Sequence, residues 1–494
     1  MSDPVTPAAR AVGFVGARAL RAGDLLAGRD GELADITNLV VAERVVLLYS
    51  PSGAGKTSLL QAGLVPALRR RKQYVPLGDD PDGAAPPQFL LPDAFDPDGR
   101  PTGQPVVVRV NTPPDSDAPA NRYVRSAVLA LHSGLPPTVR LPDADLNGIS
   151  LCEYLSRAYP SAATAPADDD PDDDPPDPSY PVLIFDQFEE ALTLDPADEE
   201  DKQAFFQDLG RAAADRSRWF VFAMREDHLA ELEPYLGYLP RWLAARLRID
   251  RLKRDPAADA VKQIVDNAGY PIEKTTAEAL VDKLRTLTES RADEGFKAQE
   301  ARAGKQRMYP TVEPLFVQVV GLRLLTDRKP KTEVTRQDVD AIDVERVLAS
   351  YFAEEVEAAT GGDRQVERWT RLWFDRALLN RDGRRVSSRE TEADEYGVPP
   401  EVLAWLDTRF VIRRVIEGGV VCYEIAHDRL AGAVRRDNLR WRRERLTPFE
   451  RAAAVWANTA KPRPAELLVG GAVLAEGEAA DRAGWLDDDE TEFL

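Results

Sequence analysis

The sequence is poor in cysteine and has no long apolar run. Its 494 residues include two cysteines, Cys152 and Cys422, which are too few and too far apart for a disulfide framework or a cysteine-rich metal cluster. No 18 consecutive residues are apolar, and residues 1–11 lack the basic start and apolar centre of a signal peptide. These absences predict a soluble, cytoplasmic protein that has no membrane partner.

Basic residues are outnumbered by acidic ones. Lysines and arginines total 64 and acidic residues total 84, so the formal net charge is 64 − 84 = −20. We therefore do not expect the dominant basic surface that a primary nucleic-acid or anionic-membrane binder needs. One local cluster of arginines occurs in residues 434–446. The acids between these arginines favour a solvated helix face or an intramolecular ion-pair surface over a nucleic-acid site.

Two segments are rich in proline and aspartate. Residues 78–104 have too little apolar content to pack, so we expect an inserted loop there. Residues 160–179 contain DDDPDDDPPDP, whose like charges and prolines predict a second insertion that acts as a solvated linker. Calcium-binding loops need glycine and a graded spacing of acids, which this second segment lacks, so it is not expected to hold a metal ion.

Residues 45–60, VVLLYSPSGAGKTSLL, are the most informative stretch. An apolar run predicts a short buried strand and a helix begins at Ser58, so the turn between them has the setting of a P-loop. Lys56 is expected to reach the β- and γ-phosphates of ATP and Thr57 to hold Mg²⁺, while backbone amides face the phosphates. The expected nucleotide-binding residues of this turn are Ser52, Gly53, Ala54, Gly55, Lys56, Thr57 and Ser58.

Ser50 departs from the usual pattern of this turn, G-x-x-x-x-G-K-[ST], which begins with glycine. We expect a tight backbone turn at that position, where serine incurs a steric cost for a positive φ. The alternative to a nucleotide site is a chance glycine-rich turn, which the flanking strand and helix disfavour.

A second motif is VLIFDQFEE, residues 182–190. Its apolar run ends in an aspartate, as in a central parallel strand that delivers a carboxylate to the ligand edge of a sheet. This Walker B pattern predicts that Asp186 holds Mg²⁺ and that Glu189 or Glu190 orients or deprotonates the attacking water. The residues alone leave the choice between the two glutamates open, and an ordinary strand end is the alternative.

A further buried strand, residues 219–224, ends before Arg225. An arginine at the tip of the strand beside Walker B suits the γ-phosphate of ATP, because its guanidinium binds phosphate in a bidentate manner. A salt bridge with Glu226 or Asp227 is the competing interpretation. Residues 247–252 are expected to form the last strand of the sheet.

Strands that alternate with helices up to residue 255 predict an α/β fold, a doubly wound parallel sheet that binds its ligand at the carboxyl ends of the strands. Beyond residue 255 the pattern is helical. A strand pair, residues 410–416 and 420–424, lies between helices in the order of a winged helix. The expected helices of this half are residues 257–268, 276–287, 313–326, 336–341, 344–359, 366–379 and 400–408 and a helix from 428 onward.

These patterns divide the chain into successive parts. The predicted organisation is a lead segment (1–27), a P-loop domain (28–255) with the two insertions, a helical subdomain (256–345), a winged-helix domain (346–446), and a helical C-terminal extension with an acidic tail (447–494).

The motifs together resemble the STAND class of P-loop ATPases, and within it the bacterial novel STAND NTPases. The similarity rests on segments spread over residues 13–436. They are GFVGARAL, AGRDGEL, YSPSGAGKTSLLQAGLVPAL, VVVRVN, VLIFDQFEE, FAMRED, VEPLFVQVV and YEIAHDRLAGAVRR.

The resemblance implies three further nucleotide contacts. Gly28 and Arg29 resemble a pair that lines the adenine side of the pocket, with a surface turn as the alternative. Pro314 corresponds to a proline placed against adenine, although by itself it is a helix-starting proline. His427 resembles a winged-helix histidine that contacts the β-phosphate of ADP, with a helix-capping histidine as the alternative.

By the same resemblance, we expect an ATPase that acts as a slow ATP/ADP-controlled switch in bacterial signalling, with a role in conflict with phage. ATP is expected to release surfaces for self-association, and effector and sensor functions are expected on other proteins. Two other functions stay open. One is an AAA-like remodelling ATPase with rapid turnover, and the other is a winged-helix regulator that binds DNA.

Overall fold

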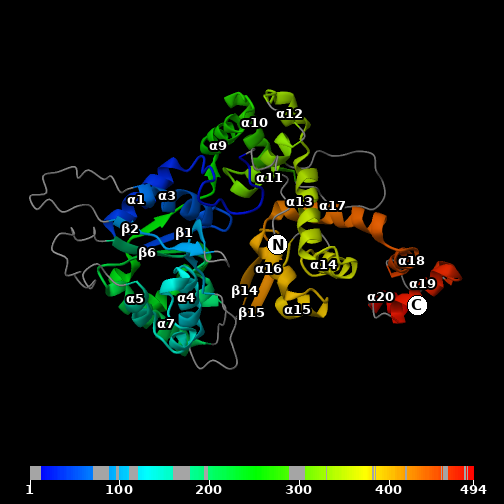
Figure 1. The fold of residues 1–494 in the computed structure, drawn as a ribbon. Helices are drawn as coiled ribbons and strands as arrows, with labels where there is room; N and C mark the ends of the chain where they lie inside the picture. Colours follow the sequence, from blue (N-terminus) through cyan, green and yellow to red (C-terminus); the bar gives the residue numbers. More distant parts are fainter. Residues whose placement is uncertain are drawn as a thin grey trace, which may run out of the picture. The chain divides into compact units, whose positions relative to one another are not determined.

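The computed structural model describes most of the chain in two compact units. The described residues are 13–70, 88–95, 100–110, 121–159, 179–193, 198–288, 306–326, 328–329, 331–380, 383, 385–417, 420–457, 459, 465–482, 486 and 488–494. One unit comprises Met1–Leu287 and Gln306–Ile342, and the other comprises Thr288–Lys305 and Asp343–Leu494. Figure 1 labels the helices and strands of both units.

The first unit is built on a parallel sheet in the order β2-β6-β7-β1-β8, and β5 pairs with β6 as well. Apolar runs that are buried on both faces form its central strands, as the sequence predicted. The strands are β1 (Val45–Ser50), β2 (Gln88–Leu90), β5 (Val107–Val108), β6 (Ser179–Phe185), β7 (Trp219–Arg225) and β8 (Arg246–Arg248).

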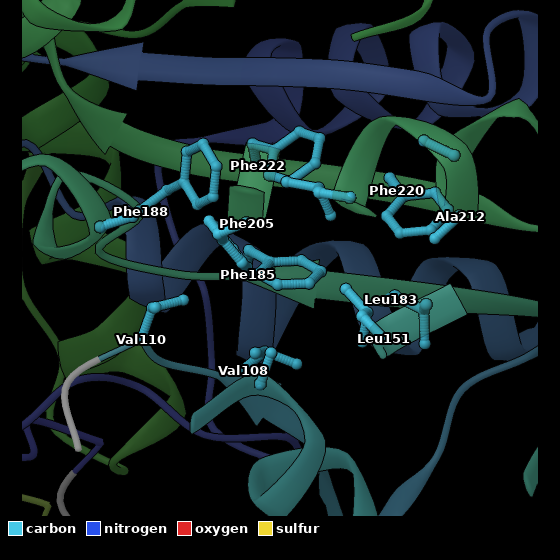
Figure 2. Close-up of a cluster of buried hydrophobic side chains, with 14 of the residues drawn as sticks. Val108, Val110, Leu151, Leu183, Phe185, Phe188, Phe205, Ala212, Phe220 and Phe222 are labelled. Carbon is cyan, nitrogen blue, oxygen red and sulfur yellow. The ribbon is translucent and has the colours of Figure 1, made fainter. Parts of the chain in front are cut away.

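Helices cover both faces of this sheet. On one face α4 (Arg122–Ser133), α5 (Leu151–Ala158) and α7 (Glu199–Ala214) enclose a core rich in phenylalanine, part of which is drawn in Figure 2. On the other face α1 (Asp30–Ala42) and α3 (Val65–Arg70) pack on alternate residues of the same strands. Two separate cores, one on each face, confirm the predicted α/β layering and hold the sheet's carboxyl edge in place.

The helix after the P-loop is not a regular α-helix. The sequence predicts a helix that begins at Ser58, whereas the structure has α2 (Lys56–Ser58), a π-helical segment (Leu59–Leu64) and then α3. Gly63 lies in the π segment, where a Cβ atom would stand 2.6 Å from Cδ2 of Leu26. Glycine at this position therefore lets the segment before α1 pack directly on the helix backbone.

The first proline-rich segment is not a plain loop. The prediction of an unstructured insertion over residues 78–104 is wrong for its second half, where β2 joins the main sheet and β3 (Asp93–Phe95) pairs with β4 (Pro101–Pro105). Leu91 beside β2 is buried, so a few apolar residues in a polar segment suffice to add an edge strand. Residues 78–87, 96–99 and 160–178 lie outside the described residues.

The predicted last strand, residues 247–252, is divided into two. β8 runs parallel to β1, while β9 (Leu252–Lys253) pairs with β12 (Thr311–Val312) in an antiparallel ribbon. The break lies at Asp250, whose carboxylate accepts a hydrogen bond from the backbone N–H of Arg251 at 2.8 Å. This local bond competes with strand pairing and redirects the chain.

Four helices of the first unit follow β9 in the chain. They are α9 (Arg254–Asn267), α10 (Lys274–Arg285), α11 (Pro314–Leu325) and α12 (Arg336–Ala341), close to the predicted bounds. Among the described residues, no helix is both long enough and apolar enough to cross a membrane.

The second unit is mostly helical around a three-stranded sheet in the order β13-β15-β14. The sequence did not predict β13 and α15, because a two-residue strand and a six-residue helix are too short to leave a periodic pattern. The elements are α13 (Val344–Ala359), α14 (Arg364–Arg376), β13 (Ser388–Arg389), α15 (Glu390–Glu395), α16 (Pro400–Thr408), β14 (Ile412–Glu417), β15 (Val420–Ile425), α17 (Asp428–Arg445), α18 (Pro448–Ala457), α19 (Ala472–Arg482) and α20 (Asp488–Phe493).

The acidic end of the chain is an ordered helix, α20, and not only a tail. Phe493 is buried, and its ring centroid lies 5.4 Å from that of Phe449 and 5.4 Å from that of Trp456. Glu490 is also buried and forms an ion pair with Arg368. One aromatic residue and one paired carboxylate therefore dock a segment whose composition is otherwise that of a solvated tail.

We predict that Phe493→Ala releases α20. Truncating a buried phenylalanine costs about 3 kcal/mol of unfolding free energy, which exceeds what six helical residues contribute alone. Urea unfolding would show this loss, and limited proteolysis would cut within residues 472–494. Leu494→Ala is the matched control, because Leu494 is 37% exposed. Equal behaviour of the two variants would contradict the docking of α20.

Candidate functional site

The glycine-rich turn between β1 and α2 has the backbone of a phosphate-binding loop. Gly53 has φ of 74° and Gly55 has φ of 94°, values that favour glycine. Gly55 directly precedes Lys56, the first residue of α2. Successive N–H groups of such a turn line a concave surface that favours an anion.

Ser50 does not carry the steric cost that the sequence suggested. It is the last residue of β1 and does not have a positive φ, since the left-handed residues of the turn are Gly53 and Gly55. Its buried hydroxyl accepts a hydrogen bond from Nζ of Lys56 at 2.9 Å. The departure from glycine therefore gives the lysine a partner inside the loop.

Lys56 is held among charged groups. Burial lowers the pKa of its ammonium, and the carboxylates of Glu189 and Asp186 act in the opposite direction. A buried ammonium whose main protein partner is a neutral hydroxyl gains most from an incoming anion. Phosphate is the anion that this loop geometry suits.

Asp186 and Thr57 meet although 129 positions separate them in the chain. Oγ1 of Thr57 donates a hydrogen bond to Oδ2 of Asp186 at 2.5 Å, and the N–H of Gln187 donates to Oδ1 at 2.9 Å. Among the described residues, no three His, Cys, Asp or Glu side chains form a metal group. Mg²⁺ needs no such group, because a hydroxyl, one carboxylate and the nucleotide's phosphates supply its oxygens. The pair therefore fits the expected ion.

Glu189 and Glu190 have different surroundings. Glu189 accepts a hydrogen bond from the backbone N–H of Arg225 at 3.2 Å. Glu190 forms an ion pair with Arg109, which follows β5. Burial raises the pKa of Glu190 to about 7, Arg109 lowers it in part, and the neighbouring carboxylates Glu189 and Asp186 raise it further.

Sequence reasoning did not single out Arg109. It lies in the segment VVVRV. A charged residue near the end of an apolar strand was the only sequence feature that could have indicated a place in the site. Its partner is 81 positions away, so the ion pair itself could not be read from spacing.

Arg225 reaches the site through its strand. β1 and β7 are parallel neighbours, and Ser50 lies opposite Arg225 in the register. The guanidinium is close enough to Lys56 to lower the ammonium's pKa, after the larger effects of burial and of the carboxylates. Nη2 of Arg225 donates to Asp227 at 2.7 Å, so the competing salt bridge is present. The end of β7 therefore lies beside the phosphate loop, as predicted, and the side chain of Arg225 bonds Asp227.

Gly28 and Arg29 lie at the start of a helix, as the alternative interpretation expects, since Arg29 is the N-cap of α1, but they do not form a surface turn. Arg29 is buried, and its Nη2 donates to the carbonyl oxygen of Ala54 in the P-loop at 2.7 Å. Gly28 has φ of 72°, and a Cβ atom there would stand 2.5 Å from the carbonyl oxygen of Pro256. The pair therefore ties the segment before α1 to both the phosphate loop and α9.

Pro314 begins α11 and also borders the loop. Its Cγ lies 3.7 Å from where a Cβ atom of Gly55 would be. The helix-starting role and the place next to the nucleotide loop are thus both present. Ser58, by contrast, uses its hydroxyl to accept a hydrogen bond from the N–H of Leu20 at 3.0 Å.

A second ion pair at the loop was missed. Arg251 lies with Nε 3.1 Å from Oε1 of Glu313, and its Nη2 donates to the carbonyl oxygen of Ser52 at 3.3 Å. The Glu313 carboxylate borders Gly53. Arg251 lies between β8 and β9, and Glu313 lies at the start of α11. The two residues are far apart in the sequence, so no local pattern links them.

His427 lies in the second unit. Its Nδ1 accepts a hydrogen bond from the N–H of Arg429 at 3.0 Å, which makes it the N-cap of α17, the alternative role. Lys56, Asp186, Glu189, Arg225 and the other candidate residues before Ile342 belong to the first unit. The contact of His427 with a nucleotide stays a prediction.

Two solved structures that resemble this chain are a Walker-type ATPase and an ORC2 protein. A Walker-type ATPase of Pyrococcus abyssi, PABY2304, is 13% identical with a TM-score of 0.41, and the match covers 85% of this chain and 98% of that one. The ORC2 protein of Aeropyrum pernix, solved as ADPNP–ADP complexes, is 12% identical with a TM-score of 0.37 over 87% and 98%. The comparison with curated proteins found no match.

The family comparison is decisive by contrast. The sequence model of one family, Novel STAND NTPase 1, matches residues 20–433. This span contains the phosphate loop, Asp186, Arg225 and His427. The resemblance inferred from the sequence is confirmed, and the chain belongs to the Novel STAND NTPase 1 family of P-loop NTPases.

Proposed function

We propose that this chain is a switch that binds ATP and ADP, hydrolyses ATP slowly, and changes its conformation and self-association with the nucleotide. The observation that carries the proposal is the meeting of Lys56, Thr57 and Asp186 at one edge of the sheet, beside a glycine-bent loop. A triphosphate there would find an ammonium, loop amides and a magnesium pair. That donor set is the one phosphoryl transfer requires.

The side chains have separate tasks in this proposal. Lys56 exchanges the hydroxyl of Ser50 for phosphate oxygens, and Arg29 holds the loop from behind through Ala54. Thr57 and Asp186 hold Mg²⁺, which neutralises phosphate charge when it is bound. Pro314 supports the adenine side. Arg225 contacts the γ-phosphate after leaving Asp227.

Glu189 and Glu190 are both placed to act on water. Glu190 has a pKa of about 7, the range in which a general base works best at neutral pH, but Arg109 holds it. Glu189 has the stronger electrostatic effect on Lys56 and is bonded to the backbone of β7. We assign proton abstraction to Glu190 and positioning of the P-loop cation to Glu189.

We infer slow turnover from the ion pairs that the catalytic side chains form within the chain. Before hydrolysis, Arg225 must leave Asp227, and the carboxylate of Glu190 must exchange its hydrogen bonds with Arg109 for water while it stays beside that charge. Each exchange breaks a charge-assisted hydrogen bond, and such bonds are about twice as strong as neutral ones. A site that has to break two charge-assisted hydrogen bonds at each turnover is better suited to a slow switch than to an ATPase with rapid turnover.

The second unit would read the nucleotide. We interpret α16, the β14–β15 hairpin and α17 as the core of a winged helix. Because Nδ1 of His427 accepts from a backbone N–H, the neutral ring carries its proton on Nε2. That N–H is a donor suited to the β-phosphate of ADP. Exchange of ADP for ATP would then shift the balance between two states.

The cellular setting is proposed from the family alone. We place the switch in bacterial signalling against phage, with the effector and the sensor on separate proteins. Self-association in the ATP state is the expected output of the switch.

Lys56→Ala is expected to abolish nucleotide binding, weakening it at least about 100-fold, because the loop loses its ammonium. Calorimetric titration of ATP and ADP with Mg²⁺ measures this. Lys262→Ala is the control, since Lys262 pairs with Asp266 on the surface of α9. Unchanged ATP affinity in Lys56→Ala would exclude the loop as the binding site.

The pH dependence of hydrolysis identifies the base. A base with a pKa of about 7 is deprotonated above that pH, so the single-turnover rate should fall about tenfold for each pH unit below 7. Glu190→Gln should retain bound ATP. Arg109→Gln removes the charge that lowers the pKa of Glu190, so the inflection should move to higher pH. A rate that stays constant from pH 6 to pH 8 would contradict Glu190 as the base.

His427→Asn separates capping from nucleotide sensing. Asparagine caps helices well but is too short to replace Nε2, so this variant should keep its stability and release ADP faster. His427→Ala should release ADP faster and also lose about 1 kcal/mol of stability. Stopped-flow release of fluorescent ADP and urea unfolding measure the two effects. A normal ADP release rate in His427→Asn would leave the histidine with a capping role only.

A further inference from the structure

The second unit contains a cavity of about 400 Å³ between α14, α17 and α18. The residues that line it recur at helical spacing on α14 and α17, so one face of each helix is turned toward the other. The P-loop residues of the proposed nucleotide site lie in the other unit, and His427, the proposed nucleotide contact of this unit, does not line the cavity. The charged or polar wall residues of interest are Arg368, Arg371, Arg376, Arg435, Trp441 and Arg442.

Three of these arginines are explained by structural ion pairs. Arg368 contacts the carboxylates of Glu450 and Glu490. Arg371 contacts Asp437 at 2.8 Å. This contact agrees with the prediction that residues 434–446 form ion pairs within the chain. Arg442 similarly contacts Asp375 at 2.7 Å. These pairs hold the helices together.

Arg435 differs from them. Among the described residues it has no ion pair or hydrogen bond, and it is exposed at the wall of the cavity. Its Nη1 lies 2.9 Å from where a Cβ atom of Gly383 would be, so the guanidinium rests against a residue that has no side chain. The carboxylate of Asp375 feels the charge of this guanidinium without forming an ion pair with it, so the hydrogen-bond donors of Arg435 are available to an anion.

Trp441 supplies a second unused donor. Its Nε1 is buried and has no hydrogen-bond partner among the described residues. The ring is fixed by the guanidinium of Arg371, which lies 5.4 Å from its centroid. A buried N–H that has no hydrogen-bond acceptor costs folding free energy. A ligand with an acceptor atom would remove that cost.

The composition of the wall defines the ligand. Five arginines and three carboxylates, Asp375, Glu450 and Glu490, give the lining a charge of 5 − 3 = +2 in a chain whose net charge is −20. Leucines and alanines of α14, α17 and α18 form the apolar part. The volume falls in the range of small-molecule sites.

We propose that this cavity binds a small organic phosphate. The guanidinium of Arg435 contacts the phosphate oxygens, for which its planar fork is suited. The indole N–H of Trp441 donates to an acceptor on the ligand, and the apolar body of the ligand packs on the leucine and alanine side chains. The chain would then carry a ligand site of its own outside the P-loop.

Calorimetric titration of the full chain tests the proposal. The Lys56→Ala variant is used throughout so that the P-loop does not take up the probe, and the probes are phenyl phosphate and inorganic pyrophosphate. Phenyl phosphate should bind at one site with a Kd below about 1 mM, and more tightly than pyrophosphate because it also fills the apolar part. Arg435→Gln should raise its Kd about tenfold.

Two further variants make the test specific. Arg443→Gln removes an arginine of the same helix that is exposed and does not line the cavity, so it should leave the Kd unchanged. Trp441→Phe keeps an aromatic ring and removes the unpaired N–H, so it should weaken binding about threefold while the chain stays folded. Arg435→Lys, which keeps the charge and loses the planar fork, serves if Arg435→Gln does not fold.

Several outcomes would overturn the proposal. No heat of binding for either probe up to about 10 mM would show that the cavity does not accept such anions. An equal loss of affinity in Arg443→Gln and Arg435→Gln would show that the probe binds the general basic surface of α17. Unchanged affinity in both Arg435→Gln and Trp441→Phe would place the probe elsewhere.

Discussion

The hydrogen bond from Thr57 to Asp186 is the contact on which the nucleotide site depends. It joins the residue that follows the phosphate-loop lysine to the end of β6, a strand that is not adjacent to β1. β7 lies between them and pairs with both strands in parallel. Because parallel strands place their carboxyl ends at one edge, two cores rich in apolar residues position a hydroxyl and a carboxylate for one ion.

Three charged side chains of the site contact other residues of the chain. Lys56 bonds Ser50, Arg225 bonds Asp227, and Glu190 pairs with Arg109. A nucleotide therefore competes with existing partners and does not enter a set of free charges. The free-energy difference between such alternative pairings is what a two-state switch requires, since a ligand shifts an equilibrium only through its differential contacts with the two states.

Charge pairing has another consequence in the second unit. Most arginines that line the cavity between α14, α17 and α18 form ion pairs with acids of α14, α17, α18 and α20. Arg435 and the indole of Trp441 depart from that rule, and they do so on the wall of one cavity. Hydrogen-bond donors without a partner, next to donors that have one, indicate a ligand site more specifically than positive charge alone.

The sequence alone determined the local chemistry, because glycines at Gly53 and Gly55, an apolar run ending in Asp186 and the helical periods each depend on near neighbours. It did not determine β2 within a polar segment, the break at Asp250, or the docking of Phe493. It also could not yield the pairs Arg109–Glu190 and Arg251–Glu313. Those features were decided by tertiary structure, because each joins residues far apart in the chain whose energies depend on burial and on a partner that no local pattern specifies.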